Sequence, residues 1–107
     1  MDELTPVVID LNKLKEDKLD ESFLAMFGWG IKKILEAVFG DLSIPVHLKG
    51  NPRDVKSFLN TLGAEKKYIQ NFKSLGLDNP RTYRSKSVLD TAIGKFERGT
   101  GIKWPFK

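Results

Sequence analysis

Residues 23–39 form the most apolar stretch of the chain, and they constrain the fold more than any other segment. Twelve of these 17 residues are apolar, two are glycine, and the three charged ones are Lys32, Lys33 and Glu36. On a helix that turns about 100° per residue, the large apolar side chains occupy an arc roughly 200° wide. One helix packed on one small core needs about half that width. The sequence therefore predicts a helix over residues 21–39 that packs on the core and on one further surface.

The helical wheel divides this predicted helix into a broad apolar face and one tryptophan outside it. Trp29 falls on the charged side, away from the broad face. A tryptophan there is covered either by another part of the same chain, which we favour, or by a partner. Gly28 and Gly30 lie inside the helix and indicate a close approach of another backbone or a bend. The residues that we predict to form an interface with a second copy are Phe23, Phe27, Trp29, Ile31, Ile34 and Val38.

Length and composition limit the number of domains and exclude several kinds of site. With 107 residues and a hydrophobic share of 40%, the chain is expected to form a single domain over residues 1–107. Residues 1–20 can be an extended or partly ordered arm of that domain. The absence of cysteine excludes disulfides and thiolate ligands for metals. The single histidine, His47, has no acid near it in the sequence, so we predict a protein that is not an enzyme and that holds no metal or cofactor.

Two short segments are predicted to be strands. The β-branched run within residues 6–11 favours a strand, although a helix that begins at Pro6 is the alternative. In residues 43–49, apolar side chains alternate with others, and Pro45 indicates an edge strand or a strand start. We expect residues 43–49 to pair with residues 6–11 or with the same strand of another copy. Together with three helices, these strands predict a helix-dominated α+β fold.

Two further helices are predicted after the second strand. Asn51 is expected to cap a helix over residues 52–76. Asp78-Asn79-Pro80 is expected to form a turn. After a polar connector over residues 81–86, Ser87 and Asp90 are expected to form a capping pair at the start of a third helix over residues 87–98. The large aromatic residues of the C-terminal tail are expected to pack on the core, and they are Trp104 and Phe106.

Glu65 has two interpretations, which depend on whether the helix over residues 52–76 is continuous. In a continuous helix Glu65 falls inside the apolar arc, where a carboxylate needs a partner or has a raised pKa. If the helix breaks at Gly63, Glu65 lies in the first turn of a new helix, where negative charge is favourable. We favour the break at Gly63. No second acid is placed to form an acid–base pair with Glu65.

Charge is unevenly distributed along the chain. Residues 1–47 carry nine acids and five bases, whereas residues 48–107 carry five acids and thirteen bases. The basic half either contacts an anionic partner or complements the acidic half, within the fold or between copies. The candidates for contacts with phosphate or nucleic acid are Lys66, Lys67, Lys73, Arg81, Tyr83, Arg84, Lys86 and Lys103. Tyr83 is the candidate for stacking on a base, and a solvated surface is the favoured alternative for the whole set.

Three stretches of the sequence have a familiar pattern: residues 23–40, the run Ala64–Tyr68, and the run from Asn79–Tyr83 through Gly101–Phe106. Together they resemble small uncharacterised proteins of tailed bacteriophages, of a kind also common in marine metagenomes. The resemblance covers about residues 20–107 and brings no catalytic motif, so no functional residue is carried over. It implies a virion component or a phage accessory protein that acts by assembly.

The leading functional hypothesis is a non-enzymatic assembly protein that forms a homo-oligomer through residues 23–39. The alternative is a nucleic-acid-binding accessory protein that uses residues 66–86 and the C-terminal tail. Peripheral membrane contact through residues 23–39 is the least favoured hypothesis, and a spanning helix is not expected because no segment reaches about 18 uncharged apolar residues. No secretion signal is visible at the acidic start of the chain, so the host cytoplasm or a virion is the expected location. We identify no internal repeat.

Overall fold

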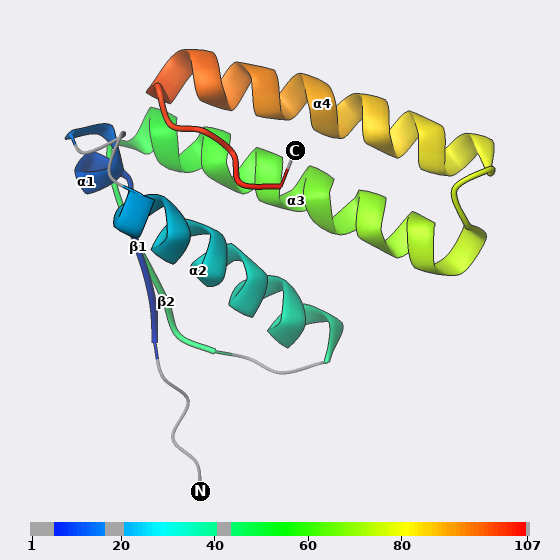
Figure 1. Ribbon diagram of the computed structural model, residues 1–107, viewed down its shortest axis with the longest axis horizontal. Coiled ribbons are helices and arrows are strands. Elements are labelled where there is room, and N and C mark those ends of the chain that lie inside the picture. Colours follow the sequence, from blue (N-terminus) through cyan, green and yellow to red (C-terminus); the bar gives the residue numbers. More distant parts are fainter. Residues whose placement is uncertain (1–5, 17–20, 41–43, 107) are drawn as a thin grey trace, which may run out of the picture.

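A computed structural model describes residues 6–16, 21–40 and 44–106 of the chain. Helices dominate this structure, and two short strands pair in parallel, so the predicted helix-dominated α+β class is confirmed (Figure 1). In chain order the elements are β1 (Val7–Asp10), α1 (Leu11–Glu16), α2 (Glu21–Phe39), β2 (Val46–Lys49), α3 (Pro52–Leu75) and α4 (Pro80–Thr100).

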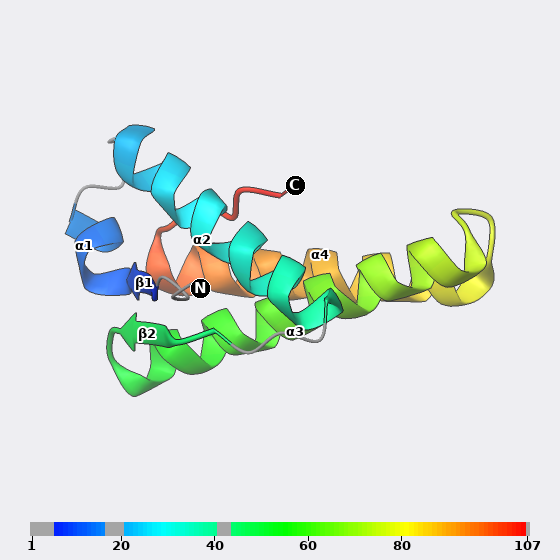
Figure 2. The same cartoon turned by 90° about the horizontal axis from the view of Figure 1, so that it is seen from below.

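The two longest helices, α3 and α4, form an antiparallel hairpin that organises the rest of the chain (Figure 1). Figure 2 shows α2 and the C-terminal tail on the same side of this hairpin. We call that side the inner face, because the buried residues of α3 and α4 lie on it. The opposite side, which we call the outer face, carries exposed residues along both helices.

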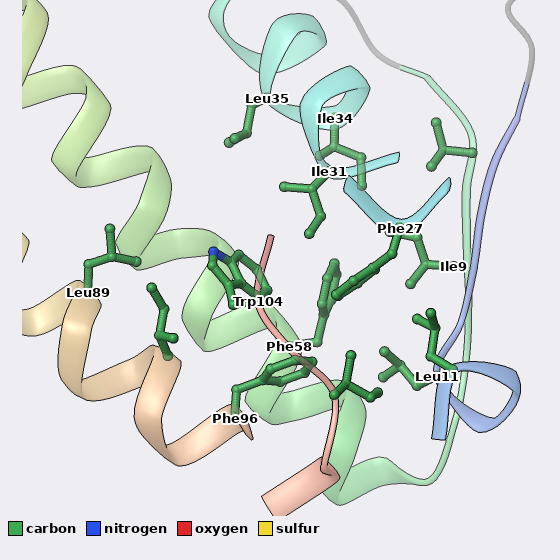
Figure 3. Packing of buried hydrophobic residues seen from close by; sticks show 14 residues of the cluster. Ile9, Leu11, Phe27, Ile31, Ile34, Leu35, Phe58, Leu89, Phe96 and Trp104 are labelled. Carbon is green, nitrogen blue, oxygen red and sulfur yellow. The ribbon is translucent and has the colours of Figure 1, made fainter. Parts of the chain in front are cut away.

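Four aromatic rings from four different segments form the centre of the core on the inner face. Phe27 of α2, Phe58 of α3, Phe96 of α4 and Trp104 of the tail pack so closely that every pair of ring centroids is 5.4–6.4 Å apart (Figure 3). Trp104 is 2% exposed, which confirms the predicted docking of the tail. The same prediction is wrong for Phe106, which comes after a proline and remains 39% exposed.

Strand β1 packs directly against α2, and glycine makes this possible. A Cβ atom at Gly30 would lie 3.2 Å from Cγ1 of Val7 and 3.4 Å from Cγ1 of Ile9. Any larger residue at position 30 would push the strand away from the helix. Gly28 has the same role toward the tail, because its Cβ would lie 3.3 Å from Cβ of Pro105. Both glycines therefore leave room for side chains of another segment to lie against the backbone of α2.

The two strands are shorter than predicted and lie side by side in one chain. Val7 pairs with Val46 and Asp10 with Lys49, so the pairing over residues 7–10 and 46–49 is parallel. Val7 and Ile9 are buried while Val8 is exposed, which is the alternation expected of a strand with one face on the core. The predicted pairing of the two segments is confirmed, within narrower bounds.

Helix α1 follows β1 directly and packs on the core. Its apolar residues Leu11 and Leu14 are buried. Nζ of Lys15 lies 2.8 Å from Oδ2 of Asp54, which ties α1 to the first turn of α3. The described part of the predicted arm over residues 1–20 is thus packed on the domain, while residues 1–5 and 17–20 lie outside the described residues.

Helix α3 begins where the sequence predicted and runs without a break. Oδ1 of Asn51 accepts a hydrogen bond of 2.8 Å from the amide of Asp54, and Pro52 occupies the first helical position. The favoured break at Gly63 is wrong. A Cβ at Gly63 would meet no described atom within 4 Å, so the glycine faces open space on the outer face. Its penalty of about 1 kcal/mol relative to alanine is small beside the packing of a long helix.

Helix α4 begins seven residues before the predicted start at residue 87 and ends at Thr100 rather than at 98. Oδ1 of Asn79 accepts a hydrogen bond of 2.9 Å from the amide of Arg81, and Pro80 is the first helical residue. The prediction was wrong because Asn79-Pro80 was interpreted as a turn, and Ser87 with Asp90 as a capping pair. Asp90 instead accepts a hydrogen bond of 2.6 Å from Nζ of Lys86 within the helix.

Candidate functional site

An open groove runs along the outer face of the hairpin, between α3 and α4. It has two adjoining stretches of about 830 Å³ and 440 Å³, which share Asn60, Val88 and Ala92. Small and polar side chains form most of its floor, including Gly63 and Thr91. The shared residues lie near the middle of both helices, so the two stretches form one continuous groove along the hairpin.

Six basic side chains line this groove, three at each end. The trio at the end near the α3–α4 connection, which we call the loop-end trio, consists of Lys67, Arg81 and Arg84. The trio at the opposite end, which we call the open-end trio, consists of Arg53, Lys56 and Lys95. All six residues are exposed, and among the described residues no acidic side chain lines either stretch.

The two trios are related by a constant offset of 28 residues in the sequence. Arg53 corresponds to Arg81, Lys56 to Arg84, and Lys67 to Lys95. Four further pairs with the same offset are identical residues: Asn51 with Asn79, Pro52 with Pro80, Ser57 with Ser85, and Ala64 with Ala92. With Arg53–Arg81 and Lys67–Lys95, six of the 28 positions in residues 51–78 are identical to the position 28 residues later, and all six lie within residues 51–67. We call this set of matching positions the 28-residue repeat.

Antiparallel packing converts this sequence repeat into an approximate two-fold symmetry. Oγ1 of Thr61 lies 3.3 Å from the carbonyl oxygen of Ala92, and Oγ1 of Thr82 lies 3.3 Å from the carbonyl oxygen of Asn71. This register places residues 62–63 of α3 opposite residues 90–91 of α4, which are their own counterparts in the repeat. The symmetry axis therefore passes between the helices at the centre of the groove, and each trio combines residues of both helices.

The charges of the two trios are available to a ligand. Among the ion pairs between described residues, none involves any of the six cations. Four acids close to these cations in the sequence have other partners: Asp54 is paired with Lys15, Glu65 and Glu97 accept hydrogen bonds from Trp104, and Asp90 accepts one from Lys86. The N-termini of α3 and α4 lie at opposite ends of the hairpin, and each contributes a partial positive charge close to one trio.

The structure brings together three of the eight residues predicted to contact phosphate or nucleic acid, and it separates the rest. Lys67, Arg81 and Arg84 form the loop-end trio, whereas the open-end trio was not predicted. The 28-residue repeat is the signal that would have identified the missing residues. The predicted residues that do not line the groove are Lys66, Lys73, Tyr83, Lys86 and Lys103.

Three of the predicted residues that do not line the groove have other surroundings. Lys73 and Lys86 make contacts elsewhere, and Tyr83 is exposed to solvent. Nζ of Lys73 lies 4.7 Å from the ring centroid of Phe39, at the side of the hairpin where α2 ends. Hydrogen bonding to Asp90 raises the pKa of Lys86 and holds its ammonium on α4. Tyr83 is 62% exposed but outside the groove, so it provides no stacking surface there.

The residues predicted to form an interface on α2 divide into core and surface. Phe27, Ile31 and Ile34 are 3%, 0% and 8% exposed, so this chain's own core uses them. Trp29 is 51% exposed, and the expectation that another part of the chain covers it is wrong. Val38 is 38% exposed, and the side chain of Phe23 lies outside the described residues. Two parts of the chain cover the broad apolar arc of α2: β1 packs on one part of it, and the aromatic core packs on another.

Glu65 lies on the inner face of α3, where it is 5% exposed. Nε1 of Trp104 donates a hydrogen bond of 2.9 Å to Oε1 of Glu65. Burial raises the pKa of the Glu65 carboxyl, and the hydrogen bond from Trp104 partly opposes this. The continuous-helix interpretation of Glu65, which was not the favoured one, is therefore correct.

Comparison of the chain with protein-family models, with curated proteins and with solved structures gives no match. Within residues 6–16, 21–40 and 44–106, no helix has the length and apolar character needed to cross a membrane. The same part of the chain contains no group of three or more acidic or histidine side chains arranged to hold a metal ion. His47 is exposed on β2.

Proposed function

We propose that this protein binds nucleic acid through the outer groove of the α3–α4 hairpin. The observation that supports this most directly is the collection of six exposed cations along one groove with no acidic residue among its described lining residues. A regular polyanion is the ligand class that such an arrangement matches, because each ammonium or guanidinium can neutralise one phosphate.

The proposal predicts a strong dependence of binding on salt. Contacts between cations and phosphates release counterions from nucleic acid, and six contacts correspond to a slope of about −5 in a plot of log K against log salt concentration. Because Arg and Lys contacts to phosphate do not distinguish bases, the affinity is expected to be nearly independent of sequence.

A charge-neutralised variant tests the proposal. Binding of a fluorescent mixed-sequence DNA of about 20 base pairs is measured by anisotropy at about 50 mM salt. The triple variant Lys67→Gln/Arg81→Gln/Arg84→Gln is expected to lose at least tenfold in affinity. The matched control is Lys32→Gln/Lys49→Gln/Lys103→Gln, which removes the same charge from exposed residues that do not line the groove.

The control separates a specific groove from general positive charge. Equal losses in both triple variants would overturn the assignment of binding to the groove. No binding of DNA or RNA by the unmodified protein at about 50 mM salt would overturn the proposed function itself.

Self-association is a second candidate function, supported by two exposed apolar side chains on α2. Met26 and Trp29 are 65% and 51% exposed and lie one helical turn apart, so they belong to the same side of α2. Nζ of Lys33 lies 5.8 Å from the ring centroid of Trp29, which leaves much of the indole uncovered. Exposed tryptophan is enriched where proteins contact each other.

Light scattering over a range of concentrations tests this second candidate. An increase of mass with concentration is expected, and Met26→Ser/Trp29→Ser should abolish it. The control is Leu77→Ser, since Leu77 is also exposed but lies after α3. A mass equal to one chain at every concentration would exclude self-association.

A further inference from the structure

The approximate two-fold symmetry of the groove carries information about the shape of its ligand. The loop-end and open-end trios contain equivalent residues in equivalent places on antiparallel helices. A ligand that fills both trios equally must present two equivalent sets of anionic groups in opposite directions. The two antiparallel strands of a double helix are arranged in this way, and two-fold symmetric proteins commonly align their axis with that of the duplex.

The distance between the trios gives a second constraint. On α3, Lys67 of the loop-end trio lies 11 and 14 residues after Lys56 and Arg53 of the open-end trio. On α4, Lys95 of the open-end trio lies 11 and 14 residues after Arg84 and Arg81 of the loop-end trio. At a rise of about 1.5 Å per residue, the trios are separated by about 16–21 Å along the hairpin. The major groove of B-form DNA is about 12 Å wide, and the phosphates on its two sides bring the distance between their centres to about 18 Å.

From these two matches we propose that the outer groove takes double-stranded B-form DNA, with one trio on each of the two strands that flank the major groove. This inference rests on the proposed function and specifies its ligand. The hairpin lies across the major groove, and the symmetry axis between α3 and α4 coincides with a two-fold axis of the duplex.

The residues between the trios define the mode of binding. The middle of the groove contains Asn60, Gly63, Val88 and Ala92, none of which is aromatic or charged. Single-stranded nucleic acid is normally bound by aromatic side chains on which bases stack, and no aromatic residue lines the described groove. The duplex is thus held at two places on its backbone, and only neutral side chains lie between them.

Rigidity favours the duplex for the same geometry. Double-stranded DNA has a persistence length of about 50 nm, so its phosphates hold their spacing over the length of the hairpin without further ordering. A single strand must lose backbone freedom before it can occupy both trios, which weakens its binding.

Competition among three nucleic acids of the same sequence and of about 20 nucleotides per strand tests the inference. Duplex DNA is expected to bind at least tenfold more tightly than single-stranded DNA and more tightly than duplex RNA, whose deep major groove is narrow. Equal or tighter binding of single-stranded DNA or of duplex RNA would overturn the inference and leave the proposed function in place. Failure of all three to bind would remove both.

Two trio variants test the symmetry independently of the ligand comparison. In Lys67→Gln/Arg81→Gln/Arg84→Gln and in Arg53→Gln/Lys56→Gln/Lys95→Gln, the salt slope for duplex DNA is expected to fall from about −5 to about −3. The two variants should lose the same affinity within about a factor of three. An unchanged affinity and slope in the open-end variant would show that one trio acts alone and would overturn the two-strand arrangement. Circular dichroism confirms that both variants are folded.

Discussion

The inner and outer faces of the α3–α4 hairpin are built by the same two helices, yet the three basic matches of the 28-residue repeat all lie on the outer face. On the outer face, the counterparts of Arg53 and Lys56 are also basic. On the inner face, Glu65 corresponds to Ile93 and Phe58 to Lys86. The six outer cations are exposed, so burial in the core does not account for their repetition.

The inner face differs between the two helices because their neighbours differ. Phe58 of α3 packs on Phe27 of α2 and on Trp104 of the tail. Its counterpart in α4, Lys86, is directed to Asp90 and to the ring of Tyr68. Two helices that met identical neighbours could keep identical inner residues, whereas α2 and the tail cover this hairpin unequally.

The largest expected effect is the loss of an aromatic ring from the inner face. Phe58 is 0% exposed and contacts three other rings, so Phe58→Ala should lower the free energy of unfolding by about 3–5 kcal/mol. On the outer face, Val88 is 62% exposed, and Val88→Ala should change the free energy of unfolding by less than about 0.5 kcal/mol. Urea denaturation measures both. Similar effects at the two positions would contradict the division of the hairpin into a core face and a surface face.

Removal of the indole donor should have the next largest effect. In Trp104→Phe the buried carboxyl of Glu65 loses its hydrogen bond, and stability should fall by about 1–3 kcal/mol. In a Glu65→Leu background the same change at position 104 should be less destabilising, because the orphaned carboxyl is absent. A double-mutant cycle by urea denaturation measures this difference. Additive effects would show that Glu65 and Trp104 do not depend on each other.

Replacement of Glu65 itself should alter the pH dependence of stability. Because its pKa is raised in the folded state, the unfolded chain releases this proton first, so stability falls as pH rises from the ordinary value of 4.5 to the folded pKa. Glu65→Gln keeps a carbonyl to accept from Trp104 and removes the titration. Thermal unfolding should show a gain over the unmodified protein that is absent below pH 4.5 and full above the folded pKa of Glu65.

The exposed Glu36 provides the control for this titration. Glu36→Gln makes the same change at an exposed position on α2, and at neutral pH it should change the free energy of unfolding by less than about 0.5 kcal/mol. A Glu65→Gln variant that parallels the unmodified protein at every pH would contradict the buried position of the carboxyl.

The smallest expected effect is on the outer face. Arg84 shares a trio with Arg81 and Lys67, and like charges one helical turn apart repel each other. Arg84→Gln should therefore raise the free energy of unfolding by up to about 0.5 kcal/mol at low salt and by less at about 1 M salt, where screening is strong. Urea denaturation at the two salt concentrations measures it. A clear loss of stability would show that Arg84 supports the fold.

Local signals in the sequence predicted much of the fold correctly. The bounds of α2 and the start of α3 were predicted from apolar periodicity and from the Asn51-Pro52 cap. The error at the start of α4 arose because the same two residue types at Asn79-Pro80 were interpreted as a turn. Local sequence alone allows both outcomes for Asn-Pro, and tertiary contacts of the next residues decide between them. Here Oγ1 of Thr82 donates a hydrogen bond of 2.7 Å to the carbonyl of Gly76, which helps to hold the start of α4 against the end of α3.

The candidate site was half predicted. Lys67, Arg81 and Arg84 stood out because they lie in a basic segment, whereas the open-end trio draws on residues up to 42 positions apart, from Arg53 to Lys95. Density of charge along the chain finds cations that are close in sequence. Charge density along the chain does not identify cations that an antiparallel hairpin brings together from distant positions. It also does not exclude cations such as Lys86, which the fold pairs with an acid.

Residue types and their order along the chain were enough to set the helical content, the caps of α3, the absence of thiol chemistry and the excess of positive charge in residues 48–107. These properties depend on residue type and on neighbours within one or two helical turns. Three other features are decided only by the tertiary structure. The chain's own core buries Phe27, Ile31 and Ile34 of α2, Glu65 is buried against Trp104, and two sets of cations lie at opposite ends of one groove. Each of these depends on contacts between segments far apart in sequence, whose geometry is set by how the hairpin, α2 and the tail pack.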